Sequence, residues 1–501
     1  MPAAVFDPVK IDPRQIPDDV RAVCQRLRDA GHQAHLVGGG IRDLLLGRPP
    51  ADFDVATDAH PQVVLALFGA RYAIPTGLQH GTVTVLAGAE GARRHVEVTT
   101  FRGEGAYVDG RRPSSVTYVG SLDEDLSRRD FTMNAIGYDP LAGALTDPFA
   151  GRDDLVRRLV RAVGDPEARF REDGLRPMRA VRQAAQLGFT IDPPTLAAIR
   201  PTLDVFRKVS VERVRDEMMK MLASPRPSVG IELMRETGLL AEVLPELFES
   251  VGVTQNRFHK HDVYGHTLAV VDATKGGALT RLGALLHDIG KPRARQPREG
   301  APGEYSFFKH EYVGADMADA VARRWKLSNA DREQVVALVS HHMFFYTPDW
   351  TDGTVRRFVR RVGPEVLPAL FALREGDIAG RGFDENPEGE LGELRRRIDA
   401  VTAEDAAMSV GDLAIDGRDL MRVLGVPPSR AIGVLLERLL ERVLDDPALN
   451  TAPRLEELAR ALAAEGPVPP SPSKPSTSSP SPSSSPIPAA EAPSAPPRKP
   501  R

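Results

Sequence analysis

Hydrophobic and polar positions follow two different patterns along the chain. Between about residues 33 and 138, short segments alternate in polarity or are rich in β-branched residues, which is typical of strands. We predict strands at Ala34–Val37, Phe53–Ala56, Thr82–Leu86 and His95–Phe101, and a helix that begins at Ile41–Leu46. From about Arg152 onward the pattern is helical almost throughout. Strands first and helices later predict an α+β head followed by all-α domains.

Composition narrows the class of protein. The chain has 501 residues, which is enough for several hydrophobic cores. Its single cysteine, Cys24, excludes a disulfide framework and a cysteine-based zinc site. No apolar run is long enough to cross a bilayer, and residues 1–17 do not have the pattern of a signal peptide. We therefore expect a cytoplasmic protein without a membrane partner.

Charge and low complexity add two expectations. The net charge of −4 gives no overall signal for nucleic-acid binding, so an RNA partner must be held by local basic clusters. Such clusters occur at 356–361 and 395–397, although charge runs of this kind are also common on solvated helix faces. Residues 467–501 are almost entirely Pro, Ser and Ala, and we expect this tail to be disordered.

Glycines and acidic residues in the first predicted strands and turns indicate a metal-dependent reaction on phosphates. Gly38, Gly39 and Gly40 follow a strand and begin a helix, where backbone N–H groups can approach a phosphate, although a plain tight turn has the same pattern. Asp52 and Asp54 are two residues apart on a predicted strand and therefore face the same side. Two close carboxylates repel each other unless cations neutralise them, and oxygen ligands favour Mg²⁺.

Glu97 is a third candidate carboxylate, because alternation in its predicted strand separates it from the apolar residues on the other face. An exposed acidic turn at Asp52 and Asp54 and a salt-bridged strand residue at Glu97 are the alternatives. If the three act together, we expect two Mg²⁺ ions to activate a 3′-hydroxyl and stabilise the leaving pyrophosphate without a protein base. This reaction is nucleotidyl transfer, with Asp52, Asp54 and Glu97 as the catalytic residues.

Five segments in order resemble the motifs of class II tRNA nucleotidyltransferases and bacterial poly(A) polymerases. They are 36–47 with Asp52-Phe53-Asp54, 128–135, 147–151, 170–182 and 210–213. The resemblance implies a polymerase-β-like nucleotidyltransferase head with a mixed sheet, a helical neck and Mg²⁺ as the cofactor. It also implies a set of nucleotide-binding residues: Gly38, Gly39, Arg42, Arg128, Arg129, Asp130, Asn134, Asp173, Arg176, Arg179 and Arg182.

The fourth motif has the chemistry of a base reader. Asp173, Arg176, Arg179 and Arg182 recur every third residue, which predicts one helical stripe, although a solvated ion-pair face is spaced in the same way. Cytosine and adenine both present an amino donor beside a ring-nitrogen acceptor. Asp173 can accept from the amino group and Arg176 can donate to the ring nitrogen, whereas guanine and uracil would leave unmet partners. Pro177 leaves the start of the helix open.

The polymerase branch is assigned by smaller features. Residues 76–84 and 109–113 resemble the CCA-adding branch, and we find no basic segment of the poly(A) branch at the equivalent place. We therefore expect CCA addition to tRNA 3′ ends from CTP and ATP. A CC-adding or A-adding enzyme and a poly(A) polymerase remain alternatives. A different class of alternative is a phosphohydrolase whose head only senses nucleotides.

Histidines and aspartates interrupt successive apolar helices in the second half of the chain. His266, His287, Asp288 and Asp377 resemble the metal-binding set of the HD phosphohydrolase superfamily, with His310 and His341 as possible ligands of a second ion. Imidazole and carboxylate ligands suit a divalent transition metal with an open position for water. A decayed, purely structural HD domain is the alternative. Intact ligands favour phosphohydrolase or cyclic phosphodiesterase activity on RNA ends.

These patterns together predict a division of the chain into six parts. They are a nucleotidyltransferase head at 28–150, a neck at 151–215, a helical body at 216–257, an HD domain at 258–381, a helical region at 382–466 and the tail at 467–501. We expect tRNA, ATP and CTP as partners, with the tRNA held on basic helical surfaces by shape and phosphate contacts. The sequence predicts no particular oligomeric state.

Overall fold

The computed structural model describes residues 10–103, 118–255, 260–298, 300, 304–382, 388–403 and 408–465. The chain divides into two compact units, Met1–Glu404 and Asp405–Arg501, and each is described by itself. The predicted tail and residues 109–113 lie outside the described residues. The boundaries predicted within the first unit stay predictions.

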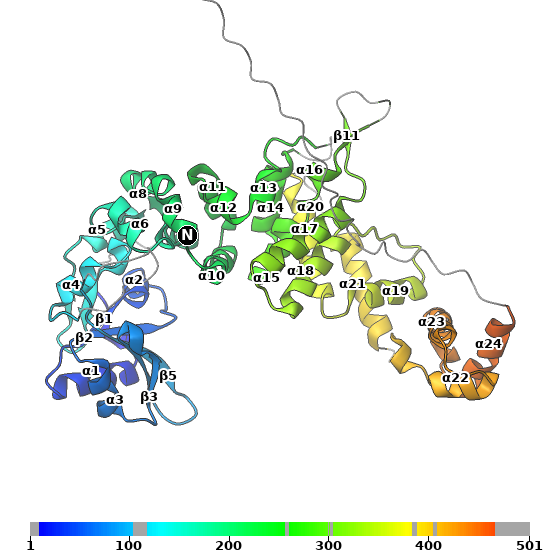
Figure 1. The fold of residues 1–501 in the computed structure, drawn as a ribbon, viewed down its shortest axis with the longest axis horizontal. Helices are drawn as coiled ribbons and strands as arrows, with labels where there is room; N and C mark the ends of the chain where they lie inside the picture. The colour runs from blue at the N-terminus through cyan, green and yellow to red at the C-terminus, as the bar shows by residue number, and fades with distance from the viewer. Residues whose placement is uncertain are drawn as a thin grey trace, which may run out of the picture. The chain divides into compact units, whose positions relative to one another are not determined.

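The head is built on a mixed sheet of seven strands with the order β3-β4-β5-β2-β1-β6-β7. Neighbouring strands are antiparallel except β2 and β5, which run parallel (Figure 1). The strands are β1 His35–Val37, β2 Phe53–Thr57, β3 Ala73–Gly77, β4 Thr82–Ala87, β5 Arg94–Thr100, β6 Gly137–Asp139 and β7 Ala144–Thr146. The predicted mixed sheet is confirmed.

Sequence patterns located the inner strands better than the edges. The structure has strands at all four predicted segments, within one or two residues at each end. The two edge strands β3 and β7 were not predicted, and neither was β6, which lies beside β7. β3 contains Pro75, whose missing N–H is tolerated at a sheet edge but weakens the strand pattern in the sequence. β6 and β7 have only three residues each, too few to show an alternation.

Helices pack on the sheet and complete the hydrophobic core of the head. The sheet buries Val55, Val83, Val85, Val96 and Val98, and helices α1 and α3 pack against β4. The α-helices of the head are α1 Asp18–Asp29, α2 Gly39–Leu45, α3 Pro61–Phe68 and α4 Leu122–Ser127. Short 3-10 turns are η1 Pro13–Gln15, η2 Leu78–His80 and η3 Thr132–Asn134.

The segment that follows the head is helical, as predicted. Its elements are α5 Gly151–Arg157, α6 Pro166–Glu172, α7 Arg176–Leu187, α8 Pro193–Ala197, η4 Arg200–Thr202, α9 Leu203–Phe206, α10 Val211–Leu222, α11 Pro227–Thr237, α12 Leu239–Val243 and α13 Pro245–Phe248. A two-strand ribbon joins β8 Leu159–Val160 to β9 Thr190–Ile191. Helix α7 is almost entirely buried and packs on α10 and α11.

The rest of the first unit is a helical bundle, and several of the helices that pack together in it are far apart in the sequence. Helix α14 packs on α20, α17 on α18, and α15 on both α18 and α20. The helices are α14 Val263–Ala273, α15 Ala278–Leu286, α16 Lys291–Ala294, α17 His310–Arg324, α18 Asn329–His341, α19 Asp352–Val362, α20 Leu367–Gly380 and α21 Glu388–Ala403. A small ribbon pairs β10 Gln296–Pro297 with β11 Tyr305–Ser306.

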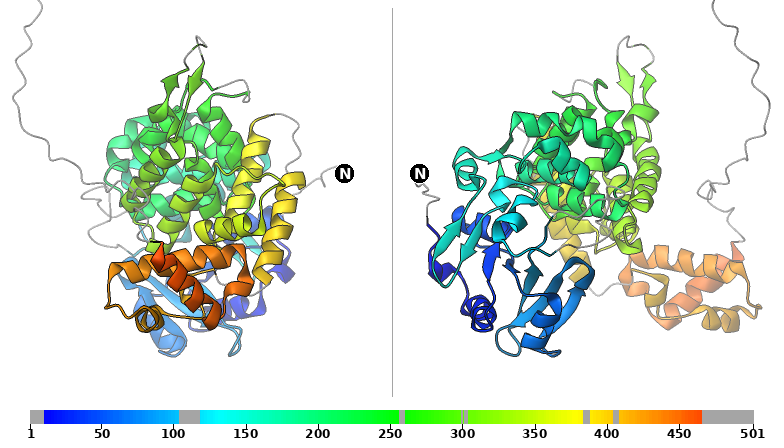
Figure 2. Two further views of the ribbon diagram at one scale, coloured as in Figure 1. Left: turned by 90° about the vertical axis from the view of Figure 1, so that its right-hand side faces the viewer. Right: turned by 60° about the vertical axis from the view of Figure 1, so that its left-hand side comes forward.

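The second unit has its own small helical core (Figure 2). Leu439, Leu440 and Val443 of one helix pack with Leu420, Leu455 and Ala459 of its neighbours. The elements are η5 Val410–Asp412, α22 Gly417–Leu424, α23 Arg430–Asp445, η6 Pro447–Leu449 and α24 Ala452–Ala464. Because all three α-helices contribute to one apolar cluster, the unit has the layered core expected of a compact helical domain.

Candidate functional site

Strand pairing brings the predicted catalytic carboxylates together. In the parallel pair of β2 and β5, Asp54 lies directly opposite Glu97, so both project from the same face of the sheet. Asp52 immediately precedes β2. Burial, and next the negative charge of Asp52, raise the pKa of Asp54 to about 6 even though Arg129 acts in the opposite direction. Mutual repulsion of this kind is relieved by a bound cation.

The glycine run at the start of α2 lets the backbone approach these carboxylates closely. Gly38 has a φ of +78°, and a Cβ there would lie 3.1 Å from Asp54 Oδ2 and 3.2 Å from Arg129 Nη1. A Cβ on Gly40 would lie 2.7 Å from the carbonyl oxygen of Asp52. The glycines are therefore required by close packing around the acidic pair, and Gly38 also by its left-handed backbone.

A cavity of about 340 Å³ joins the motifs that lie far apart in the sequence. Its lining includes two of the three catalytic candidates and five arginines. The polar lining residues are Asp54, Thr82, Glu97, Thr99, Arg102, Asp125, Arg128, Arg129, Asp130, Asp173, Arg176 and Arg179. A lining that contains both carboxylates and guanidinium groups can hold a divalent cation and a polyphosphate in the same space.

Asp173 lies just before the helix on which the stripe was predicted. Helix α7 begins at Arg176 with Pro177 in its first turn, where proline is tolerated, so the predicted stripe starts one turn later than expected. Asp173 ends α6 with an extended backbone, and its Oδ2 accepts a hydrogen bond from Arg213 Nη2 at 2.8 Å. Arg213 was quoted in the fifth motif without a role.

Arg176 is buried and uses its donors inside the protein. Nη1 donates to Glu172 at 2.6 Å and to the carbonyl oxygen of Arg169 at 2.8 Å, and Nη2 donates to the carbonyl oxygen of Arg128 at 2.8 Å. In this conformation Arg176 links the base-reading segment to the second motif. Its predicted hydrogen bond to a base stays a prediction.

Three further predicted nucleotide-binding residues are buried and bonded to other side chains. Arg42 Nη1 donates to Asn134 Oδ1 at 3.0 Å and to Gln183 Oε1 at 3.2 Å. Arg182 is ion-paired with Glu217 and donates to Gln186 at 2.6 Å. These contacts position the motifs relative to one another. Gln183 was missed by the sequence analysis, since a glutamine on a helix has no distinguishing pattern.

Asp130 and Arg179 form the central ion pair of the cavity. Arg179 Nη2 lies 2.6 Å from Asp130 Oδ2, and Asn134 Nδ2 donates to Asp130 Oδ1 at 3.1 Å. Although burial opposes ionisation, Arg179 and Asn134 hold the pKa of Asp130 well below its usual range. Asp130 therefore stays ionised, and it fixes the guanidinium of Arg179 at the cavity wall.

The basic segments expected to hold tRNA are largely engaged within the protein. Arg356 is buried, Arg395 pairs with Glu375 at 2.6 Å, and Arg397 pairs with Asp352 at 2.7 Å. Arg356 is therefore not on a solvated helix face, and the role of the clusters at 356–361 and 395–397 in holding tRNA stays a prediction.

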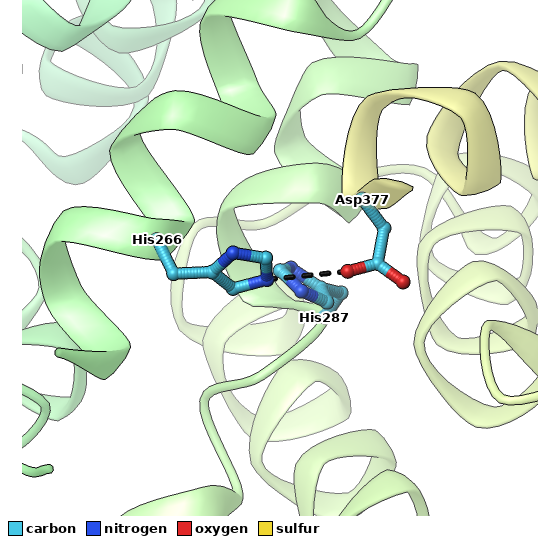
Figure 3. A group of neighbouring side chains, drawn as sticks. All are labelled: His266, His287 and Asp377. Atoms are coloured by element: carbon cyan, nitrogen blue, oxygen red, sulfur yellow. Dashed lines mark ion pairs between the residues drawn. The ribbon is translucent and has the colours of Figure 1, made fainter. Parts of the chain in front are cut away.

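A second cluster lies in the helical bundle, where five segments bring histidines and aspartates together. Two groups of potential metal ligands are present among the described residues, His266 with His287 and Asp377, and Asp288 with His310 and His342. Within each group the ligand atoms all lie within 4.8 Å of one another (Figure 3). All six side chains are buried.

Each histidine of the cluster is anchored through its Nδ1 atom. His266 Nδ1 lies 3.1 Å from the carbonyl oxygen of Gly380, and His287 Nδ1 lies 2.8 Å from that of Ala284. His310 Nδ1 lies 2.8 Å from the carbonyl oxygen of Phe307, and His342 Nδ1 lies 2.7 Å from that of Val339. A carbonyl can only accept, so each Nδ1 carries the proton and each Nε2 presents a lone pair to the centre. Burial lowers the pKa of His342 to about 3, which favours this neutral, ligating form.

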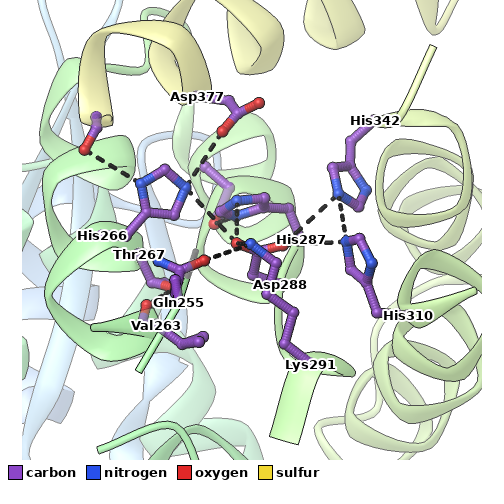
Figure 4. A network of polar contacts seen from close by, with 12 residues as sticks. Gln255, Val263, His266, Thr267, His287, Asp288, Lys291, His310, His342 and Asp377 are labelled. Atoms are coloured by element: carbon purple, nitrogen blue, oxygen red, sulfur yellow. Dashed lines mark hydrogen bonds and ion pairs between the residues drawn. The ribbon is translucent and has the colours of Figure 1, made fainter. Parts of the chain in front are cut away.

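Facing lone pairs in this cluster fit a cation. Nε2 of His310 and Nε2 of His342 lie 3.2 Å apart, and with both protons on Nδ1 no hydrogen bond can join them. Asp288 divides its two oxygens between the groups, with Oδ2 3.2 Å from His287 Nε2 and Oδ1 3.2 Å from His310 Nε2 (Figure 4). The donor set of four imidazoles and two carboxylates suits a divalent transition metal.

His342 takes the place that was predicted for His341. Helix α18 buries Val335, Leu338 and Val339, and His342 lies on that same face at the end of the helix. His341 is one residue earlier and is therefore rotated by about 100° away from the centre. The sequence offered two adjacent histidines, and only the phase of the helix distinguishes them.

Lys291 is a further residue of this cluster, and the sequence predicted no role for it. Its Nζ lies 2.6 Å from Asp288 Oδ2 and donates to Gln255 Oε1 at 2.6 Å. Although burial opposes ionisation, His287 and Lys291 hold the pKa of Asp288 well below its usual range. The carboxylate is therefore kept in the charged form that a metal requires.

Comparisons with known proteins identify the domains in which the two sites lie. Residues 34–161 match the poly A polymerase head domain family, residues 188–250 match the family described as the probable RNA and SrmB-binding site of polymerase A, and residues 255–403 match the HD domain. The CCA-adding enzyme of Geobacillus thermodenitrificans is 35% identical over 436 residues, which cover 86% of this chain and 94% of the relative. The CCA-adding enzyme of Lactobacillus gasseri is 47% identical over 435 residues, which cover 87% and 95%.

This chain belongs to the family of CCA-adding enzymes. A crystal structure of the Bacillus stearothermophilus CCA-adding enzyme in complex with CTP matches with a TM-score of 0.69 and 31% identity, covering 89% of this chain and 98% of that one. The Thermotoga maritima CCA-adding enzyme complexed with tRNA shares the fold at 18% identity, with a TM-score of 0.51 and coverage of 91% and 97%. The predicted family and fold class are thereby confirmed.

The described helices include no candidate for a membrane span. Among the described residues, no helix has the length and the apolar character that crossing a bilayer requires.

Close backbone packing makes Gly290 a test of the second cluster. A Cβ there would lie 2.3 Å from the carbonyl oxygen of His310, at the start of α17. We expect Gly290→Ala to push α17 away from α16 and to lower the free energy of unfolding by about 2 kcal/mol, as overpacking does. Urea unfolding measures this change. Gly277→Ala is the control, because its Cβ would meet open space, and equal stability of the two variants would contradict the packing argument.

Proposed function

We propose that this chain adds the nucleotides CCA to the 3′ ends of tRNA from CTP and ATP, releasing pyrophosphate. The observation that carries the proposal is the register of β2 and β5, which places Asp54 opposite Glu97 at the wall of an arginine-lined cavity. Its relatives at 35% and 47% identity are CCA-adding enzymes, which supports the same reaction here. We further propose that the protein works in the cytoplasm, where these substrates are found.

Asp52, Asp54 and Glu97 are the residues that would hold Mg²⁺. Their fit to a cation is supported by the raised pKa of Asp54, which reflects burial and then the negative charge of Asp52. When bound, Mg²⁺ supplies activation of the terminal hydroxyl and stabilisation of the leaving pyrophosphate. The chain's own contribution is to keep three carboxylates on one face of the sheet, where the RNA terminus and the triphosphate must meet.

Arginines of the cavity would bind and orient the triphosphate. Arg128 and Arg129 line the cavity, and Arg179, which also lines it, is fixed by Asp130. Guanidinium groups match phosphate oxygens in geometry and stay charged at all physiological pH values. The nucleotide is thereby held with its base toward Asp173.

Asp173 would read the base. One of its oxygens accepts from Arg213, and the other accepts from the backbone N–H of Leu175 at 3.0 Å. A carboxylate has about four acceptor sites, so Asp173 keeps capacity to accept from the amino group of cytosine or adenine. Uracil and guanine have no amino group at that place, which leaves the carboxylate unmet.

Removal of the acidic pair tests nucleotidyl transfer. We expect Asp52→Ala with Asp54→Ala to slow incorporation of labelled CTP and ATP into tRNA lacking its 3′ end by at least about a hundredfold, because metal stabilisation of the transition state is lost. Asp123→Ala, an exposed acidic residue of α4, is the matched control. An unchanged rate in the double variant would refute the reaction and favour a phosphohydrolase with a nucleotide-sensing head. In the wild-type protein, the incorporated nucleotides also separate CCA addition from CC, A or poly(A) addition.

Base selection is tested at Asp173. We expect Asp173→Ala to reduce the preference in kcat/KM for CTP over UTP at least about tenfold, because the unpaired polar group that rejects uracil is removed. Single-nucleotide incorporation kinetics measure the ratio. Asp204→Ala, which removes an exposed carboxylate nearby, should leave it unchanged. A loss of kcat/KM that is equal for both nucleotides would contradict the base-reading role.

We also propose a second function, a metal-dependent phosphohydrolase in the HD domain. The residues that would hold metal are His266, His287, Asp288, His310, His342 and Asp377, and the anchored Nδ1 atoms support this assignment. The placement of Asp288 between the two groups favours two divalent ions. Metal in such a site supplies activated water, and Lys291 keeps Asp288 ionised.

Metal content tests the two-ion arrangement. We expect about two equivalents of divalent transition metal per chain by elemental analysis, and about one in His342→Ala, which removes a ligand of one group only. His341→Ala is a matched control, because the neighbouring histidine is not in either group and should retain both ions. One equivalent in the wild-type protein, or no loss in His342→Ala, would contradict a second ion.

A further inference from the structure

Exposed aromatic side chains gather beside the HD cluster. Among the described residues, three aromatic side chains are more than half exposed, Phe308 at 78%, Phe345 at 75% and Tyr312 at 60%. All three lie within three residues of His310 or His342 along the chain. Of the three, Phe308 lines the cavity that also contains His310 and His342, and it is therefore the candidate for a binding surface.

The same region opens into the metal cluster. A cavity of about 400 Å³ is lined by Phe308 and Met343 together with Asp288, His310, His342 and Asp377. Its size is within the range of pockets that hold small ligands. An apolar flat side chain at the mouth and metal ligands at the base therefore belong to one continuous space.

Cationic side chains are part of the cavity lining. Lys309 and Arg381 line the cavity together with Glu311, and Lys309 Nζ lies 5.5 Å from the centre of the Phe308 ring, whereas Lys291 is buried and paired with Asp288. Lys309 has a φ of +62°, a conformation that side chains other than glycine rarely adopt. Such strain occurs where the surrounding structure fixes a residue for binding or catalysis. Here it fixes the turn that presents Phe308 and Lys309 immediately before α17.

We propose that this mouth binds the terminal nucleoside of a phosphate-bearing nucleotide or RNA end, with its base stacked on Phe308. Flat aromatic groups next to cations complement a base and its phosphate, and base stacking is the usual way in which proteins hold unpaired nucleotides. The direction of the phosphate toward the histidines and aspartates rests on the proposed phosphohydrolase function. The stacking surface itself does not depend on it.

Photo-crosslinking of the metal-free, full-length protein tests the surface without any reaction. The probe is a short oligoribonucleotide that ends in 4-thiouridine 3′-phosphate, and peptides are mapped after irradiation. We expect crosslinks in residues 304–312 or 342–346. Competition by the same oligonucleotide with a normal base and 3′-phosphate should remove them, and an abasic terminus should not. Adenosine 3′-phosphate as competitor separates a free nucleotide from an RNA end as the preferred ligand.

Substitutions at Phe308 make the test specific. We expect Phe308→Ala to reduce the apparent affinity of the crosslinked site about tenfold, in line with the contribution of one stacked base. Phe308→Trp should retain the affinity, because it keeps a ring. Phe248→Ala is the matched control, since it removes another exposed phenylalanine at the end of α13.

The outcomes separate this proposal from the proposed hydrolysis. An unchanged crosslink in Phe308→Ala, or a wild-type crosslink confined to the head, overturns the stacking surface. Chemical crosslinks from Lys309 to residues 408–465 without nucleotide would likewise overturn it, because the chain's own second unit would then cover the mouth. Hydrolysis with equal KM for base-bearing and abasic phosphates would support the phosphohydrolase and refute the stacking. Specific crosslinking without hydrolysis would do the reverse.

Discussion

One face of helix α7 holds the nucleotide site together. Arg176, Arg179 and Gln183 are spaced by three and four residues, so they project from the same side of the helix. They reach two different motifs of the head, namely the carbonyl oxygen of Arg128 and the carboxylate of Asp130 in the second motif and the guanidinium of Arg42 in the first. Because every one of these contacts is buried or partly buried, separating the helix from the head would leave unpaired charges. The base-reading segment is thus fixed relative to the catalytic strands.

The two sites differ in how the structure controls the protonation of their side chains. In the head, burial and then the negative charge of Asp52 raise the pKa of Asp54, and a bound cation would relieve this cost. In the HD cluster, backbone carbonyls take the Nδ1 protons of four histidines and so set which nitrogen can bind metal. The first site depends on strand register and the second on where helices end. Both rely on the backbone to decide the charge state of side chains.

Much of this arrangement could be predicted from the sequence, and the exceptions have a common cause. Strands with clear alternation were located. The carboxylates were predicted from residue type and spacing and the HD ligands from a family resemblance, and their roles stay predictions, although the structure brings Asp54 opposite Glu97 and gathers five of the six predicted HD residues. His342 was missed because adjacent histidines differ only in helix phase. Gln183 and Arg213 were missed, or left without a role, because their importance lies in contacts with residues 141 and 40 positions away. The burial of Arg42 and Arg182 likewise depends on packing between elements, which no local pattern encodes.

Helix α10, which contacts Asp173, also contacts the HD bundle. Arg213, which holds Asp173, has neighbours on the same helix that hold the turn after α17. Glu212 pairs with Lys326 Nζ at 2.5 Å, and Arg215 Nη1 donates to the carbonyl oxygen of Lys326 at 2.8 Å. Lys326 itself has a φ of +54°, so the turn is held in a conformation that a lysine rarely adopts. Since α17 begins at His310 and this turn follows it, one helix extends from the histidine and aspartate cluster to the turn that contacts α10. The HD bundle is therefore in direct contact with the helix whose Arg213 holds Asp173 in place.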